Sequence, residues 1–190
     1  RLNEDGTIGE MTDEIFHKGL GSVAERNFRP HVNCVNITPD QKYLCAVDLG
    51  VDQVKIYKFN YETGKITLVD MLRCEQESAP RIIKFSPDGR FAYLICELKN
   101  YISVYSYKDG PRGPIFELVQ TISTLNDYHS KGSAACVLRF SRDWNYVLCS
   151  NAGDNSIGIF KVDHETGMLE KICILPISGD YPKAADFFPD

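Results

Sequence analysis

The sequence predicts an all-β fold, namely a β-propeller built from four-stranded blades. Three observations predict it. One pattern of strands and turns recurs along the chain at intervals of about 50 residues. Each repeat holds about four short runs rich in Val, Ile, Tyr and Phe, separated by Pro-Asp-Gly, Gly-Val-Asp or Glu-Thr-Gly turn sequences. No segment keeps a helical period for three turns, so helices are not expected to form layers of this fold.

The repeats align on an aspartate in a tight turn. These turn aspartates are Asp40, Asp88, Asp143 and Asp190. The middle interval is longer because it contains the segment KDGPRGPIFELVQ, which is rich in Gly and Pro. The alignment predicts complete blades at residues 29–78, 79–131 and 132–180. Residues 1–28 are expected to end a preceding blade, and residues 181–190 to supply the first strand of the next one.

These blades are expected to be part of a larger ring. Propellers generally need more blades than this, because the ring must close to cover the faces of the first and last blade. The chain also begins with RLNEDGTIGE, which contains neither an initiating Met nor the apolar stretch of a signal peptide. We therefore expect the 190 residues to form one partial propeller domain, with flanking sequence absent.

Composition argues against two classes of partner. The chain has a net charge of −5 and carries no block or stripe of Lys and Arg. A nucleic acid or an anionic membrane surface is therefore not expected as a partner, because both bind basic surfaces. No run approaches the about 18 consecutive apolar residues that a membrane-spanning helix requires.

The cysteines and histidines predict free thiols and no metal site. The seven cysteines are an odd number, and most lie in apolar strand-like runs, where Cys behaves as a small hydrophobic residue. Such usage is typical of a reducing cytoplasm. No Cys-x-x-Cys pair occurs, and the four histidines are scattered along the chain. We expect neither a metal nor another cofactor.

The predicted fold gathers polar residues at one mouth of the propeller channel. The first strand of each blade lines the channel and the second returns, so the start of strand one and the end of strand two share a rim. Before the first strands stand His31 and Asn33, Arg81, Lys131 or Ser133, and Lys183; after the second strands stand Asp48, Glu97 and Asn151. The turn aspartates are expected at the other mouth, in a structural role.

Five stretches in order resemble landmarks of the lactonase-type seven-bladed propellers. They are HKGLGSVAERNFRPHVNCVNITPD, APRIIKFSPDGRFAYLICEL, QTISTL, SNAGDNSIGIFKVD and YPKAADFFPD. This group includes bacterial 6-phosphogluconolactonase and fungal 3-carboxy-cis,cis-muconate cyclase. The resemblance covers essentially the whole chain and implies a partial arc of seven blades. It also implies a cytoplasmic, metal-independent enzyme, a hydrolase of carbohydrate metabolism or a lactonising isomerase, whose substrate is a small anionic lactone.

The resemblance also implies the site residues. His31 matches the first histidine of the family's Pro-His-x-His stretch, Arg81 its Pro-Arg arginine and Glu97 its Glu-Leu glutamate. Lactone hydrolysis needs a base, positive charge near the developing oxyanion and an acid for the leaving oxygen. We predict the role of base for Glu97, that of the positive charge for Arg81, and that of acid or of a hydrogen-bond donor to the substrate for His31. The predicted substrate-binding residues are Asn33, Lys183 and Asn151.

Four positions depart from the family pattern. Asn33 replaces a histidine, Ile82 stands where a histidine commonly follows Pro-Arg, and Ala152 and Lys183 replace arginines. The change at Ala152 removes a guanidinium that can bind a carboxylate or phosphate through two parallel hydrogen bonds. The departures predict either a different substrate or a loss of activity.

Two classes of function therefore remain open. The first is a lactonase or lactonising enzyme, and the second is a non-catalytic propeller that serves as a ligand-binding or protein-interaction scaffold. In the second, Arg81 and Glu97 form a purely structural salt bridge, His31 makes a structural hydrogen bond, and Asp48 and Asn151 cap loops. A metal-dependent gluconolactonase is disfavoured, because the rim lacks a set of carboxylate ligands. The enzyme predicts that Arg81, Glu97 and His31 cluster around one polar pocket in which water reaches Glu97. The scaffold predicts that the three residues are dispersed or fully occupied with each other.

Overall fold

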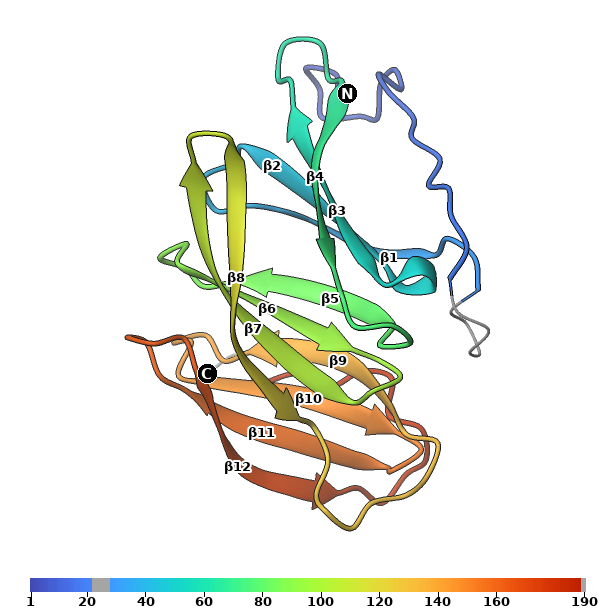
Figure 1. Ribbon diagram of the computed structural model, residues 1–190, viewed down its shortest axis with the longest axis vertical. Coiled ribbons are helices and arrows are strands. Elements are labelled where there is room, and N and C mark those ends of the chain that lie inside the picture. Colours follow the sequence, from blue (N-terminus) through green and yellow to red (C-terminus); the bar gives the residue numbers. More distant parts are fainter. Residues whose placement is uncertain (22–27, 189–190) are drawn as a thin grey trace.

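The structure is a computed structural model that describes residues 1–21 and 28–188. Its strands form three separate four-stranded antiparallel sheets, which succeed one another along the long axis of the molecule (Figure 1). Within each sheet the strands follow chain order. The predicted all-β architecture of four-stranded blades is confirmed.

The first sheet comprises β1 (Val32–Ile37), β2 (Tyr43–Asp48), β3 (Gln53–Phe59) and β4 (Ile66–Arg73), with the 3-10 helix η1 (Leu49–Val51) between β2 and β3. The second comprises β5 (Pro80–Phe85), β6 (Phe91–Cys96), β7 (Tyr101–Gly110) and β8 (Gly113–Ser123). The third comprises β9 (Ala134–Phe140), β10 (Tyr146–Ala152), β11 (Ser156–Val162) and β12 (Leu169–Pro176).

The sheets are held together by two apolar cores, one on each face of the middle sheet. Strand β6 shows why, since alternate side chains of a strand point to opposite faces. Its residues Ala92, Leu94 and Cys96 join the core shared with the first sheet. Phe91, Tyr93 and Ile95 join the core shared with the third sheet. Strand β5 contacts both β1 and β9, so the first strand of each sheet lies in one row, as in a propeller channel.

The turn between the first two strands is built identically in all three sheets. In the first sheet the Thr38 hydroxyl donates to Asp40 Oδ1 at 2.6 Å and accepts the backbone N–H of Tyr43 at 3.1 Å. Ser86 and Ser141 form the same pairs with Asp88 and Asp143, also at 2.6 Å. The turn aspartates therefore satisfy local polar groups, in agreement with the structural role expected for them.

The two ends of the chain are irregular. Residues 1–21 contain only an isolated bridge between Leu2 and Ile8, and residues 181–188 form no strand. The first strand predicted at 181–190 and the blade end predicted at 1–28 stay predictions, and Asp190 lies outside the described residues. In the part of the chain that the structure describes, no helix is long and apolar enough to cross a membrane.

The buried cysteines are expected to be unreactive in the folded protein. All seven are free, and burial raises the pKa of the Cys45, Cys96 and Cys149 thiols to about 12. Because the thiolate is the reacting species, these three should resist iodoacetamide at pH 8 while the half-buried Cys34 and Cys173 react first. Mass-spectrometric mapping checks this, with all seven labelled in guanidinium chloride as the control. Rapid native labelling of Cys149 would contradict the packing.

Candidate active site

An ion pair between Arg81 and Glu97 forms the centre of the candidate site. Arg81 is the second residue of β5 and Glu97 directly follows β6, and the two strands pair so that Pro80 lies opposite Cys96. Arg81 Nη1 donates to Glu97 Oε2. The Glu97 side chain is fully buried, whereas 23% of the Arg81 side chain is exposed. A buried carboxylate of this kind depends on a close cation, because burial removes the water that would otherwise solvate its charge.

Arg81 also ties the second sheet to the third. Its Nε donates to the backbone oxygen of Cys136 in β9 at 2.9 Å. The backbone oxygen of Glu97 accepts the Ala135 N–H at 3.0 Å, so both residues of the ion pair are hydrogen-bonded to β9. The guanidinium therefore has two of its donor groups fixed by protein acceptors, and its orientation is set before any ligand arrives.

Glu97 contributes to the wall of a polar pocket of 210 Å³. The other lining residues are Leu98, Gly132, Ser133, Ala134, Tyr181 and Lys183. The Lys183 ammonium lies 3.6 Å from Sγ of Cys136, and the backbone oxygen of the same Cys136 accepts the hydrogen bond from Arg81 Nε. The lining of the pocket thus includes Glu97, whose buried carboxylate is paired with the Arg81 guanidinium, together with a lysine and a serine. These are groups that can activate water and compensate negative charge.

Asn33 adds a residue of the first sheet to this group of polar side chains. It lies in β1, half-buried, and its Nδ2 donates to the backbone oxygen of Arg81 at 3.2 Å. The structure therefore brings Asn33, Arg81, Glu97 and Lys183 to one end of the sheets, whereas their roles at a site stay predictions. The amide of Asn33 contacts the backbone of Arg81, so it supports the strand that carries the guanidinium.

His31 lies at the same end of the sheets but in a different hollow. Its backbone N–H donates to Asp48 Oδ1 at 2.7 Å, which fixes the chain just before β1. Its exposed side chain lines a hollow of 470 Å³ together with Phe28, Arg29 and Pro30. His31 is not among the residues that line the Glu97 pocket.

Asn151 is fully buried and engaged in local hydrogen bonds. It lies in β10, and its Nδ2 donates to the Thr124 backbone oxygen at 2.8 Å and to Ser156 Oγ at 3.1 Å. These bonds connect β10 to the start of β11 and to the segment after β8. The next residue, Ala152, is also fully buried and pairs with Ala134 of the pocket wall. This part of the wall carries no charge.

The His17 side chain forms a buried cluster with Asp48 of β2 and Tyr57 of β3. The sequence analysis did not predict this cluster. His17 Nδ1 lies 2.6 Å from Asp48 Oδ2, and His17 Nε2 lies 2.9 Å from the Tyr57 hydroxyl. Asp48 also accepts the Gly50 N–H at 3.1 Å and so caps η1. Burial, and secondly the negative charge of Asp48, raises the pKa of Tyr57. The cluster ties the irregular segment 1–21 to the loop that carries His31.

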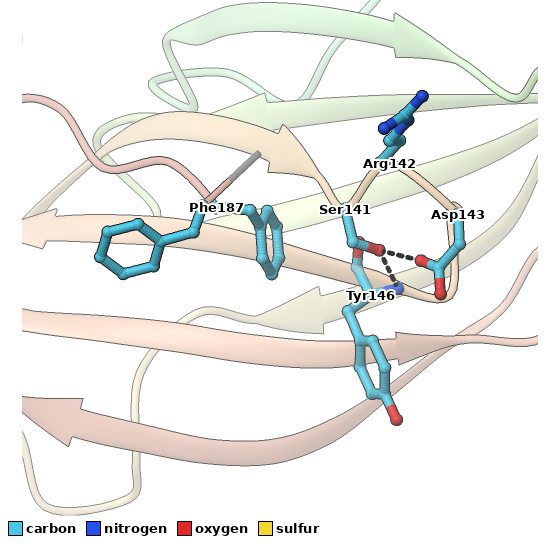
Figure 2. A pocket seen from close by; sticks show the side chains of 6 residues that line it. Ser141, Arg142, Asp143, Tyr146 and Phe187 are labelled. Atoms are coloured by element: carbon cyan, nitrogen blue, oxygen red, sulfur yellow. Dashed lines mark hydrogen bonds between the residues drawn. The ribbon is translucent and has the colours of Figure 1, made fainter. Parts of the chain in front are cut away.

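Another hollow lies at the opposite end of the third sheet. Figure 2 shows it beside the β9–β10 turn, where Ser141, Asp143 and Tyr146 meet Phe187 of the C-terminal segment. It has a volume of 710 Å³. The Ser141–Asp143–Tyr146 network inside it is the structural turn repeated in all three sheets. Arg142 and Phe188 also line this hollow.

The described residues show no metal site near the pocket. Within residues 1–21 and 28–188, no group of three or more His, Cys, Asp or Glu side chains is arranged to hold a metal ion. The described polar residues that line the pocket are Glu97, Ser133, Tyr181 and Lys183, and Arg81 pairs with the Glu97 carboxylate. Their arrangement suits an anionic ligand and an acid–base reaction.

Fold and site together define a class: an arc of a β-propeller with an ion-paired carboxylate in a polar pocket at one end of its blades. The chain belongs to the lactonase family of seven-bladed β-propellers, because the sequence model of that family matches residues 1–190. Its three sheets are therefore a partial arc of the seven-bladed ring. The family expected from the sequence landmarks is confirmed.

Three individual proteins illustrate the similarity of this chain to the family. The chain is 29% identical over 188 residues to a 6-phosphogluconolactonase of Bacillus subtilis, covering 99% of this chain and 52% of the relative. It resembles the crystal structure of a putative 6-phosphogluconolactonase from Bacteroides uniformis with a TM-score of 0.86 and 31% identity, covering 99% of this chain and 53% of that one. A periplasmic gluconolactonase of Pseudomonas aeruginosa gives a TM-score of 0.86 at 28% identity, covering 96% and 51%. The chain thus spans about half the length of the relatives that it matches.

Proposed function

We propose that the protein is a lactonase that opens a small anionic lactone, such as 6-phosphogluconolactone or a carboxymuconolactone. One observation carries the proposal: Glu97, whose buried carboxylate is paired with Arg81, lines a pocket that Lys183 also lines. Membership of the lactonase family supports the reaction type. Two cations near one pocket, in a chain whose net charge is −5, support an anionic substrate.

In the proposed mechanism Glu97 takes a proton from a water molecule, and the water oxygen attacks the lactone carbonyl carbon. Arg81 and Lys183 compensate the negative charge that develops on the carbonyl oxygen. The ring C–O bond then breaks, and Glu97 returns the proton to the departing oxygen, which yields the hydroxy acid. No metal is needed for these steps. The acid role predicted for His31 stays a prediction; the mechanism proceeds without it, because His31 lines a different hollow.

The substrate assay uses the full-length protein and a panel of lactones. We expect hydrolysis of 6-phosphogluconolactone or of a carboxymuconolactone, followed by pH-stat titration of the released acid and corrected for spontaneous hydrolysis. Turnover in the reverse, lactonising direction is followed with the corresponding hydroxy or unsaturated acid. If the protein turned over none of these compounds, the enzymatic proposal would be contradicted.

The second candidate function is a non-catalytic propeller that binds a ligand or a protein. The observation that favours it is the full burial of Glu97, whose carboxylate is already engaged by Arg81. Isothermal titration calorimetry separates the two functions. A scaffold binds the product acid without accelerating the hydrolysis of its lactone, whereas the enzyme does both.

We propose that the protein acts in the cytoplasm. Seven free thiols, four of them buried, support a reducing compartment. The gluconolactonase of Pseudomonas aeruginosa to which the chain is similar is described as periplasmic, so the compartment is a separate question from the fold. Fractionation of the source cells, followed by immunodetection, answers it directly.

A further inference from the structure

A second hollow adjoins the Glu97 pocket. Its volume is 340 Å³, and it lies between the β6–β7 turn and the segment that connects β8 to β9. It is lined by Leu98, Lys99, Asn100, Ser123, Leu125 and residues 129–133. Leu98, Gly132 and Ser133 belong to both linings, so the two hollows meet at these three residues.

Two buried polar atoms at this junction have no hydrogen-bond partner among the described residues. They are Ser133 Oγ and Asn100 Oδ1, and both residues are only 8% exposed. The Asn100 amide nitrogen donates to the backbone oxygens of Ser133 at 2.9 Å and of Leu98 at 3.2 Å, which directs its oxygen away from these contacts. Buried polar groups are normally paired, and an unpaired group costs stability. A hydroxylated ligand offers both atoms the partners that they lack.

The outer hollow also contains positive charge. Lys131 is exposed and makes no ion pair within the described part of the chain, while Lys99 pairs with Glu75. His129 also lines this hollow, and its Nδ1 lies 2.8 Å from the backbone oxygen of Asn126. Asp154 accepts the Ser130 N–H at 2.8 Å and the Ser156 hydroxyl at 2.6 Å, and Asp127 is an exposed carboxylate of the same β8–β9 connection. Among the described lysines that line the hollow, Lys131 is thus the one without an ion pair.

We propose that the two hollows form one bipartite site for a hydroxylated acid with a second anionic group at its far end. The reacting end lies beside Glu97, the hydroxylated chain passes Ser133 and Asn100, and the distal anion contacts Lys131. The inference rests on the proposed function for the identity of the reacting end. Volume supports it, because ligand pockets generally occupy about 300–1,000 Å³ and the Glu97 pocket alone has only 210 Å³.

The test compares two lactones that differ only in the distal anion, 6-phosphogluconolactone and gluconolactone. For Lys131→Met in the full-length protein, kcat/KM for the phosphorylated lactone should fall about 10-fold, since one charged contact is lost. The value for gluconolactone should stay unchanged. Lys65→Met removes a comparable exposed lysine in the β3–β4 turn and is the matched control, with no change for either substrate. Carboxymuconolactone, as a third substrate, reports whether a carboxylate substitutes for the phosphate.

Two further variants sharpen the test. Ser133→Ala should lower kcat/KM for both hydroxylated lactones, and Ser133→Thr, which keeps a hydroxyl, should restore part of it. Equal effects of Lys131→Met on the two lactones, or no effect on either, would overturn the bipartite site. Calorimetry with 6-phosphogluconate and gluconate separates this inference from the proposed function. Tighter binding of the phosphorylated acid that is lost in Lys131→Met supports the site even without turnover, whereas equal binding of both acids overturns it.

Discussion

Replacing Glu97 by Gln should lower kcat/KM for lactone hydrolysis by about 100-fold or more, because the amide cannot accept the proton of the attacking water. Gln has nearly the same shape as Glu and still accepts a hydrogen bond from Arg81, so the pocket should keep its form. The measurement is the initial rate of acid release by the full-length protein at several lactone concentrations. Circular dichroism and the thermal midpoint verify that the variant is folded.

The matched control is Glu165→Gln. Glu165 is exposed in the β11–β12 turn, at the other end of the third sheet from Glu97. The change removes the same charge from the protein, so it also controls for a general effect on the encounter with an anionic substrate. Its activity should equal that of the unmodified protein. A folded Glu97→Gln variant of full activity would remove Glu97 from the mechanism.

Replacing Arg81 by Leu should destabilise the fold by about 3 kcal/mol, because it leaves the buried Glu97 carboxylate without its guanidinium. The same change also removes the Arg81 Nε contact with the Cys136 backbone oxygen between the second and third sheets. The free energy of unfolding, from urea titration at neutral pH, measures the loss. The double variant Arg81→Leu with Glu97→Leu should recover most of it, since an apolar pair leaves no charge to compensate.

Lys108→Met is the control for this stability experiment. Lys108 and Glu117 form an exposed ion pair at 3.8 Å, with side chains that are 62% and 65% exposed. Exposed pairs contribute little, so the loss should stay below about 1 kcal/mol. If Arg81→Leu proved no more harmful than Lys108→Met, the Arg81–Glu97 pair would have no part in holding the sheets together.

The repeats predicted the three sheets because the relevant signals are local. Strand alternation and turn sequences act within a few residues, and Ser86 and Asp88 form their turn without help from distant segments. The Arg81–Glu97 pair was also within reach of the sequence. The antiparallel pairing of β5 and β6 follows from the hairpin, and it brings the start of one strand beside the end of the next.

Other features depend on contacts that no local pattern encodes. His17 contacts Asp48 from an irregular segment, so neither the strand period nor the spacing of residues along the sequence predicted the cluster. Ser133 stood among the rim candidates, but its position between two hollows depends on how the long β8–β9 connection lies against the β6–β7 turn. His31 shares a rim with Glu97 but lines another hollow, because a rim position fixes the end of a strand and not the direction of a side chain.

The central claim is that the lactone reacts beside Glu97. The most direct measurement is a crystal structure of the full-length Glu97→Gln protein with 6-phosphogluconate, a stable product acid. The account predicts that the carboxylate end of the ligand lies in the pocket beside residue 97, within hydrogen-bond distance of Arg81 or Lys183, with its phosphate toward Lys131. A ligand bound in the hollow of His31, or anywhere that leaves the pocket at residue 97 empty, would contradict it.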